Sequence, residues 1–133
     1  MGTRSLTFVY EENTPIICMY RQYDGYMTGH GQELAEFLSP FTLVNGIPVG
    51  DTRKLANGMG CLAAQLVAHF KVGTGQFYLY PPKRNQDCGQ EYAYHIYSDK
   101  VVVKESNYGT GGDQIFKGTW EEFRQATMEV MVD

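Results

Sequence analysis

The residue types best suited to chemistry are concentrated in one segment, 20–31, which reads YRQYDGYMTGHG. An arginine can hold a phosphate or a carboxylate through two parallel hydrogen bonds, so Arg21 is a candidate anion ligand. His30 could donate a hydrogen bond or move a proton, and Asp24 could orient either side chain. The three glycines lie between a strand and a helix, where unpaired backbone N–H groups attract anions. We therefore predict ligand binding by Arg21, Asp24, Tyr26, Gly29, His30 and Gly31.

The same segment also has a purely structural explanation. Asp24-Gly25 is typical of a turn, Thr28 can cap the following helix, and the glycines permit positive φ angles. One histidine and one aspartate do not make a mechanism, so the structural explanation is favoured and the catalytic residues are unknown.

The positions Tyr20-Arg21, Asp24-Gly25-Tyr26 and Gly29-x-Gly31 precede a short Leu-Ala-x-x-Leu helix. This pattern resembles a motif in small uncharacterised proteins of phages and bacteria. Those proteins often read Tyr-Arg-His-Trp-Asp-Gly-Tyr-Pro, whereas Gln22, Tyr23 and Met27 stand at the differing positions here. The resemblance implies a phage-type origin and a recurrent loop, and it carries no reaction with it.

Metal and cofactor sites are not predicted elsewhere in the chain. The three cysteines have no CxxC spacing, and the three histidines have no i, i+2 or i, i+4 pairing typical of metal ligands. Gly58-x-Gly60-x-x-Ala63 matches a dinucleotide fingerprint, but no convincing strand precedes it, so close helix packing explains it better. His95 lies among tyrosines in a predicted strand, where a stacking or hydrogen-bonding role is expected.

The elements that position these residues follow from hydrophobic periodicity. Strands are expected at 4–10 and 16–22, which form a hairpin, and at 76–80, 91–97, 100–106 and 114–118. Helices are expected near 32–38, 58–71 and 120–130, and residues 41–57 form an irregular connection. Strands and helices do not alternate regularly, which disfavours a parallel sheet. The prediction is one α+β domain, 1–133: a five- to six-stranded antiparallel sheet with about three helices packed mainly on one face.

Composition limits the partners. A net charge of −4 argues against binding nucleic acid by bulk charge, and no apolar run approaches the ~20 residues of a membrane span. An odd number of cysteines and an N-terminus without an apolar leader predict a cytoplasmic protein. Ten tyrosines predict a tyrosine-rich second sheet face, which suits a homo-oligomer, with a dimer favoured.

Three functions remain open. The leading hypothesis is a non-enzymatic binding or accessory protein of phage type, which engages a host protein or a small anionic ligand through the 21–31 loop. The second is a small enzyme in which His30 acts as general acid or base, while Asp24 and Arg21 position an anionic substrate. The third is a structural role in an assembly.

Overall fold

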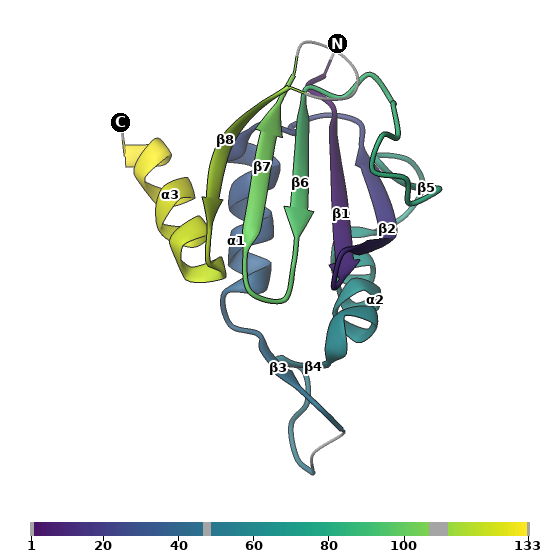
Figure 1. The fold of residues 1–133 in the computed structure, drawn as a ribbon, viewed down its shortest axis with the longest axis vertical. Helices are drawn as coiled ribbons and strands as arrows, with labels where there is room; N and C mark the ends of the chain where they lie inside the picture. The colour runs from purple at the N-terminus through teal and green to yellow at the C-terminus, as the bar shows by residue number, and fades with distance from the viewer. Residues whose placement is uncertain (1, 47–48, 107–111, 133) are drawn as a thin grey trace.

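The computed structural model describes residues 2–46, 49–106 and 112–132. Its centre is a six-stranded sheet in the order β5-β2-β1-β6-β7-β8 (Figure 1). The strands are β1 (Ser5–Glu11), β2 (Thr14–Arg21), β5 (Phe77–Tyr80), β6 (Tyr92–Ile96), β7 (Val101–Glu105) and β8 (Asp113–Gly118). The predicted α+β class and the predicted number of strands are confirmed.

The sheet is mixed, because one of its strand pairs is parallel. β1 and β2 form the predicted antiparallel hairpin, and β6-β7 and β7-β8 are also antiparallel. β6 instead runs parallel to β1, entering the sheet where β1 begins, with the N–H of Glu91 donating to the Arg4 carbonyl at 3.0 Å. The long connection through the helices and β5 makes this parallel pair possible, since such pairs need a crossover.

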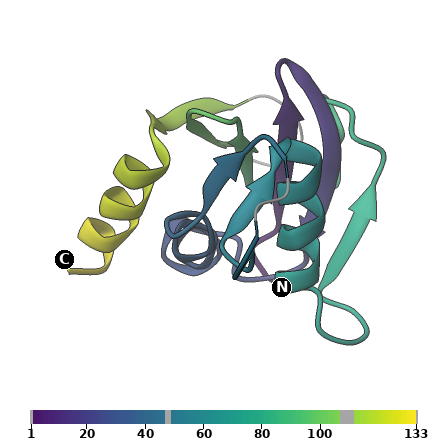
Figure 2. The ribbon, with the colours of Figure 1, turned by 90° about the horizontal axis from the view of Figure 1, so that it is seen from below.

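Three helices cover one face of the sheet: α1 (Gln32–Leu38), α2 (Gly58–Phe70) and α3 (Trp120–Val132) (Figure 2). Their apolar side chains meet the sheet in the larger core cluster, which includes Leu34, Leu62 and Phe123. The helix positions agree with those predicted. A capping box begins α3, with Thr119 Oγ1 accepting from the Glu122 N–H and Glu122 Oε1 accepting from the Thr119 N–H. None of the helices in the described ranges is long and apolar enough to cross a membrane.

The connection between α1 and α2, expected to be irregular, holds a second, smaller sheet. β3 (Thr42–Val44) and β4 (Leu55–Asn57) pair in parallel and lie below the main sheet in Figure 1. Each strand is only three residues long, too short for a periodic pattern to appear among the flanking turn residues.

None of the helices that the structure describes lies on the other face of the sheet, which we call the open face. The strand register places two rows of side chains across it. One row is Phe8, His95, Val102 and Lys117; the next is Leu6, Ala93, Lys104 and Gln114. The connection of residues 81–91 lies against part of this face, with Cys88 packed on a small cluster around Phe8 and Tyr10. β1 is consequently buried on both sides from Ser5 to Tyr10.

Candidate functional site

The structure brings Arg21 and His30 together, but inside the protein. Arg21 ends β2 on the helix-covered face, and His30 lies in the π-helical turn η1 (Met27–Gly31) that leads into α1. His30 is fully buried and Arg21 is 4% exposed. The Arg21 guanidinium donates to His30 Nδ1 at 3.1 Å, to the Tyr23 carbonyl at 2.8 Å and to the Glu33 carboxylate at 3.0 Å. Its Nε and Nη1 groups are therefore engaged within the protein.

The protonation state of His30 follows from these partners. Arginine only donates, so His30 Nδ1 carries no proton, and Nε2 donates to Thr7 Oγ1 at 2.7 Å. Burial, together with the nearby charge of Arg21, lowers the pKa of His30 to about 3. A neutral, fully enclosed imidazole has no route to a substrate proton, which weighs against the acid–base hypothesis.

The remaining residues of the 21–31 segment divide between interior and surface. Gly25 and Gly31 are buried, and the Gly25 carbonyl accepts a hydrogen bond from the Tyr94 hydroxyl at 2.8 Å. Asp24 and Tyr26 are exposed, and the Tyr26 hydroxyl donates to the Asp24 carboxylate at 3.2 Å. Gly29 is half-buried.

Close backbone contacts account for the two glycines on either side of Tyr26. A Cβ on Gly25 would lie 2.9 Å from the Ser5 backbone nitrogen, and one on Gly29 would lie 2.5 Å from the Asp24 carbonyl oxygen. The segment thus fastens β2 and α1 to β1 and β6, and ligand binding by it stays a prediction.

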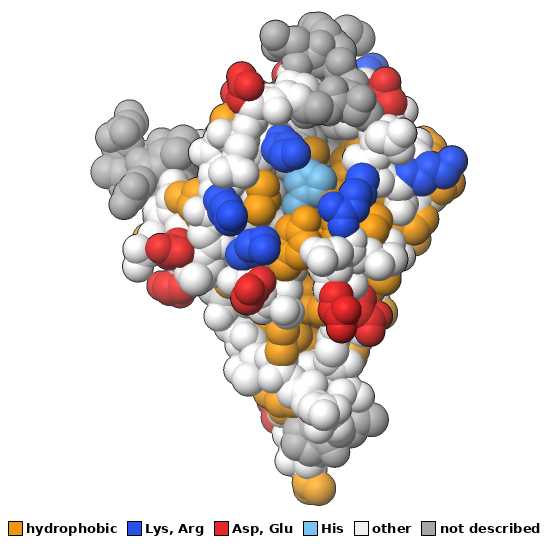
Figure 3. All heavy atoms as spheres, in the orientation of Figure 1, with side chains coloured by type: hydrophobic (Ala, Val, Ile, Leu, Met, Phe, Trp, Pro, Cys, Tyr) orange, Lys and Arg blue, Asp and Glu red, His pale blue; other side chains and the backbone are white. Residues whose placement is uncertain are grey.

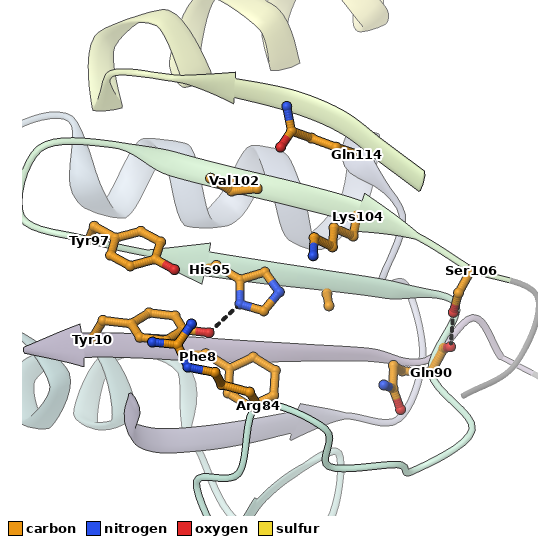
Figure 4. A pocket seen from close by; sticks show the side chains of 11 residues that line it. Phe8, Tyr10, Arg84, Gln90, His95, Tyr97, Val102, Lys104, Ser106 and Gln114 are labelled. Atoms are coloured by element: carbon orange, nitrogen blue, oxygen red, sulfur yellow. Dashed lines mark hydrogen bonds between the residues drawn. The ribbon is translucent and has the colours of Figure 1, made fainter. Parts of the chain in front are cut away.

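A separate polar hollow lies on the open face (Figure 3). Its volume is about 240 Å³, slightly below the usual range for sites that take a drug-sized ligand. The hollow forms over Ala93, because this small side chain stands between the larger Leu6 and Lys104 in its cross-strand row. Its lining, drawn in Figure 4, is Phe8, Tyr10, Arg84, Gln90, Ala93, His95, Tyr97, Val102, Lys104, Ser106 and Gln114. We call this hollow the open-face pocket.

The open-face pocket is positively charged in a protein that is negative overall. Lys104 enters it from β7 and Arg84 reaches it from the 81–91 connection (Figure 4). No aspartate or glutamate is among the described lining residues. Lys117 lies on the same face one strand further on, and Lys100 lies over the Tyr97 ring at 4.7 Å. The field at this pocket therefore favours an anion.

His95 forms part of the pocket floor and is held on two sides. Its ring stacks on Phe8, with centroids 5.0 Å apart and planes 3° from parallel, and Nδ1 lies 2.6 Å from the Tyr10 hydroxyl. Burial raises the Tyr10 pKa well above its ordinary value, so Tyr10 is a phenol at neutral pH. Burial, then Lys104 and Arg84, lower the His95 pKa to about 4. With Tyr10 donating to Nδ1, the neutral ring keeps its proton on Nε2 as a donor.

His95 both stacks and hydrogen-bonds, the two roles expected from its place among tyrosines, whereas Arg84 and Lys104 were not predicted as site residues. Alternation alone places His95 and Ala93 on one face of their strand. Alternation does not give the strand register, which sets Lys104 opposite Ala93. Nor does it give the path of the irregular connection, which places the Arg84 guanidinium 5.2 Å from the centre of the Tyr10 ring. The described residues hold no cluster of three or more side chains suited to a metal ion.

Comparison with known proteins adds no assignment. No family model matches the chain, and neither a curated protein nor a solved structure matches it.

Proposed function

We propose that this protein is a binding protein for a small anion, which it holds in the open-face pocket. The observation that carries the proposal is the joint placement of Arg84 and Lys104 in one hollow whose described lining has no carboxylate. An anion seated over Ala93 would meet both cations and the Nε2–H of His95. Charge-assisted hydrogen bonds of this kind are among the strongest available to a protein.

Arg84 and Lys104 form no ion pair with a carboxylate among the described residues. The ion pairs among the described residues are Arg21–Glu33 and Arg53–Asp51, and neither lies in the open-face pocket. Arg84 donates to the Asn13 carbonyl and lies over the Tyr10 ring, contacts that fix its position and leave its charge without a carboxylate partner. The pocket is thus prepared for a negative ligand.

Binding suits this pocket better than catalysis. Its imidazole is neutral and is oriented by a phenol rather than by a carboxylate, so its Nδ1 gains no negative partner that would strengthen a base. The arrangement supplies donors and positive charge, which recognise a ligand without changing it.

Titration with inorganic phosphate tests the proposal, with affinity measured by calorimetry and the position of binding by amide chemical shifts. Lys104→Gln should weaken binding by about tenfold, the cost of one charge-assisted hydrogen bond. Lys83→Gln removes a neighbouring exposed cation outside the lining and is the matched control. Ala93→Leu should abolish binding, because it fills the hollow without changing any charge.

Two results would contradict the proposal. One is equal phosphate affinity in Lys104→Gln and Lys83→Gln, which would show a general charge effect. The other is a set of shifted amides that excludes β6 and β7. Added sodium chloride should weaken phosphate binding, since ions screen exposed charges.

A further inference from the structure

An apolar groove lies at the opposite edge of the sheet, beside β5. It has a volume of about 370 Å³ and is lined by Met19, Val67, Lys71, Phe77, Tyr78 and Leu79. We call it the β5 groove. Leu79 pairs with Met19, so it points to the helix-covered side of the sheet, yet it is 57% exposed. α2 packs on β1 and β2, while β5 is the outermost strand beside it (Figure 2).

The edge of β5 is closed to another strand. The N–H of Gln22 donates to the Gln76 carbonyl. Because the backbone groups of successive residues in a strand point to opposite sides, those of Tyr78 also point toward β2, and those of Phe77 and Leu79 point away from the sheet. The Phe77 N–H donates to the Gly75 carbonyl at 2.7 Å, and the Phe77 carbonyl accepts from Lys71 Nζ at 2.7 Å.

Proline closes the other side of this edge. The next outward position after Leu79 is Pro81, which has no N–H to offer. Only Leu79 therefore keeps both outward backbone groups for a neighbour among the described residues of this edge. A single such residue cannot hold an added strand in register, so strand addition is disfavoured.

We infer that the β5 groove binds a small amphipathic carboxylate. Its apolar part would lie on Val67, Phe77 and Leu79, and its carboxylate would meet Lys71. This site is independent of the open-face pocket and of the function proposed for it.

Charge and size both support this occupant. Lys71 is the one charged residue in the described lining, and the described part of the chain gives it no carboxylate partner. Its ammonium donates to the carbonyls of Gly75 and Phe77 at 3.0 and 2.7 Å, which leaves one of its three N–H bonds for a ligand. A volume of about 370 Å³ lies within the usual range for small-molecule sites and is lined mainly by apolar groups.

The test compares octanoate with 1-octanol on the intact protein, below the concentration at which octanoate forms micelles. Binding is measured by calorimetry, and its position by amide shifts of α2 and β5. Octanoate should bind more tightly than octanol by up to about fivefold, the upper end of the contribution of one partly exposed ion pair. Lys71→Gln should remove this difference, because the amide keeps donors for the carbonyls but loses the charge.

Groove-filling variants test the apolar half of the inference. Val67→Phe should weaken both probes by at least about tenfold, because the larger ring occupies the groove. Leu79→Gln offers a second variant at an exposed position, where folding is not at risk, and circular dichroism checks the fold of both. Ile115→Gln changes another exposed apolar residue, on the other edge strand, and should leave binding unchanged.

Several outcomes would overturn the inference. Equal affinities for octanoate and octanol would show that the charge of Lys71 does not contribute to binding. Unchanged binding in Val67→Phe would show that the probe binds outside the groove. A wild-type dimer in sedimentation that Leu79→Gln converts to a monomer would show that a second copy covers the groove. Phosphate binding at the open-face pocket should persist in Val67→Phe. Failure of the β5-groove inference can therefore be distinguished from failure of the proposed anion binding.

Discussion

Acid should destabilise this protein through His30, and the size of the effect follows from its burial. The pKa of His30 is about 3 in the folded protein, against 6.5 for an exposed imidazole. The unfolded chain therefore binds a proton between these values while the folded protein does not. The effect of His30 on the free energy of unfolding is therefore absent above about pH 6.5, and the loss of stability grows as the pH falls toward 3.

The expected loss is set by the proton taken up on unfolding. Each pH unit below the unfolded pKa removes about 1.4 kcal/mol, and pH 4.5 lies two units below 6.5, so moving from pH 7 to pH 4.5 should cost about 3 kcal/mol through His30 alone. That amount is a large share of the stability of a small domain. Its physical origin is that an imidazolium at this place would lie unsolvated beside the Arg21 guanidinium, at 3.1 Å from Nδ1.

Urea unfolding at pH 7 and pH 4.5 measures this effect in the wild type and in His30→Gln. The variant should lose about 3 kcal/mol less on acidification, whatever its stability at pH 7, because carboxylates and His95 act alike in both proteins. His69→Gln removes an exposed imidazole and is the control for loss of a histidine. Equal acid sensitivity in the wild type and His30→Gln would refute the reasoning, as would an imidazole of His30 that titrates near its ordinary pKa in NMR spectra.

Two further predictions test the scaffold and the open-face pocket. Gly25→Ala should cost about 2 kcal/mol or more in urea unfolding, because a Cβ there meets backbone atoms at 2.9 Å where β1 begins. Gly60→Ala, on the exposed side of α2 with open space around it, should instead add about 0.5–1 kcal/mol, and a loss at both positions would contradict the packing argument. Tyr10→Phe should weaken phosphate binding by about fivefold in calorimetry, because His95 loses the partner at 2.6 Å that fixes its tautomer, and an unchanged affinity would exclude this role.

Local patterns were enough to predict most of the fold. Alternating apolar residues around the turn at Glu11–Thr14 predicted the hairpin, and three- and four-residue spacings predicted α2. The parallel pairing of β6 with β1 escaped prediction, because it depends on contacts between residues more than eighty positions apart. Local sequence carries no information on which edge of a hairpin a later strand will join.

The candidate sites show the limit of motif reasoning more sharply. Segment 20–31 concentrates polar residues and glycines, and the structure uses Arg21 and His30 as a buried polar connection between strands and helices. Arg84 and Lys104 attract no notice in the sequence, since single basic residues in a loop and a strand are common. Only the tertiary structure sets them in one hollow above Ala93.

The open-face pocket depends on how firmly the 81–91 connection is held, because this irregular segment supplies Arg84. Gln90 is 4% exposed and fastens the segment from within. Its Oε1 accepts from the Cys88 N–H at 2.8 Å, its Nε2 donates to the Gln86 carbonyl at 3.1 Å, and its own carbonyl accepts from Ser106 Oγ. Arg84 is fastened in turn to the β1–β2 turn through the Asn13 carbonyl. A ligand would thus meet a cation already in position, and the entropy of ordering the loop would not be subtracted from the affinity.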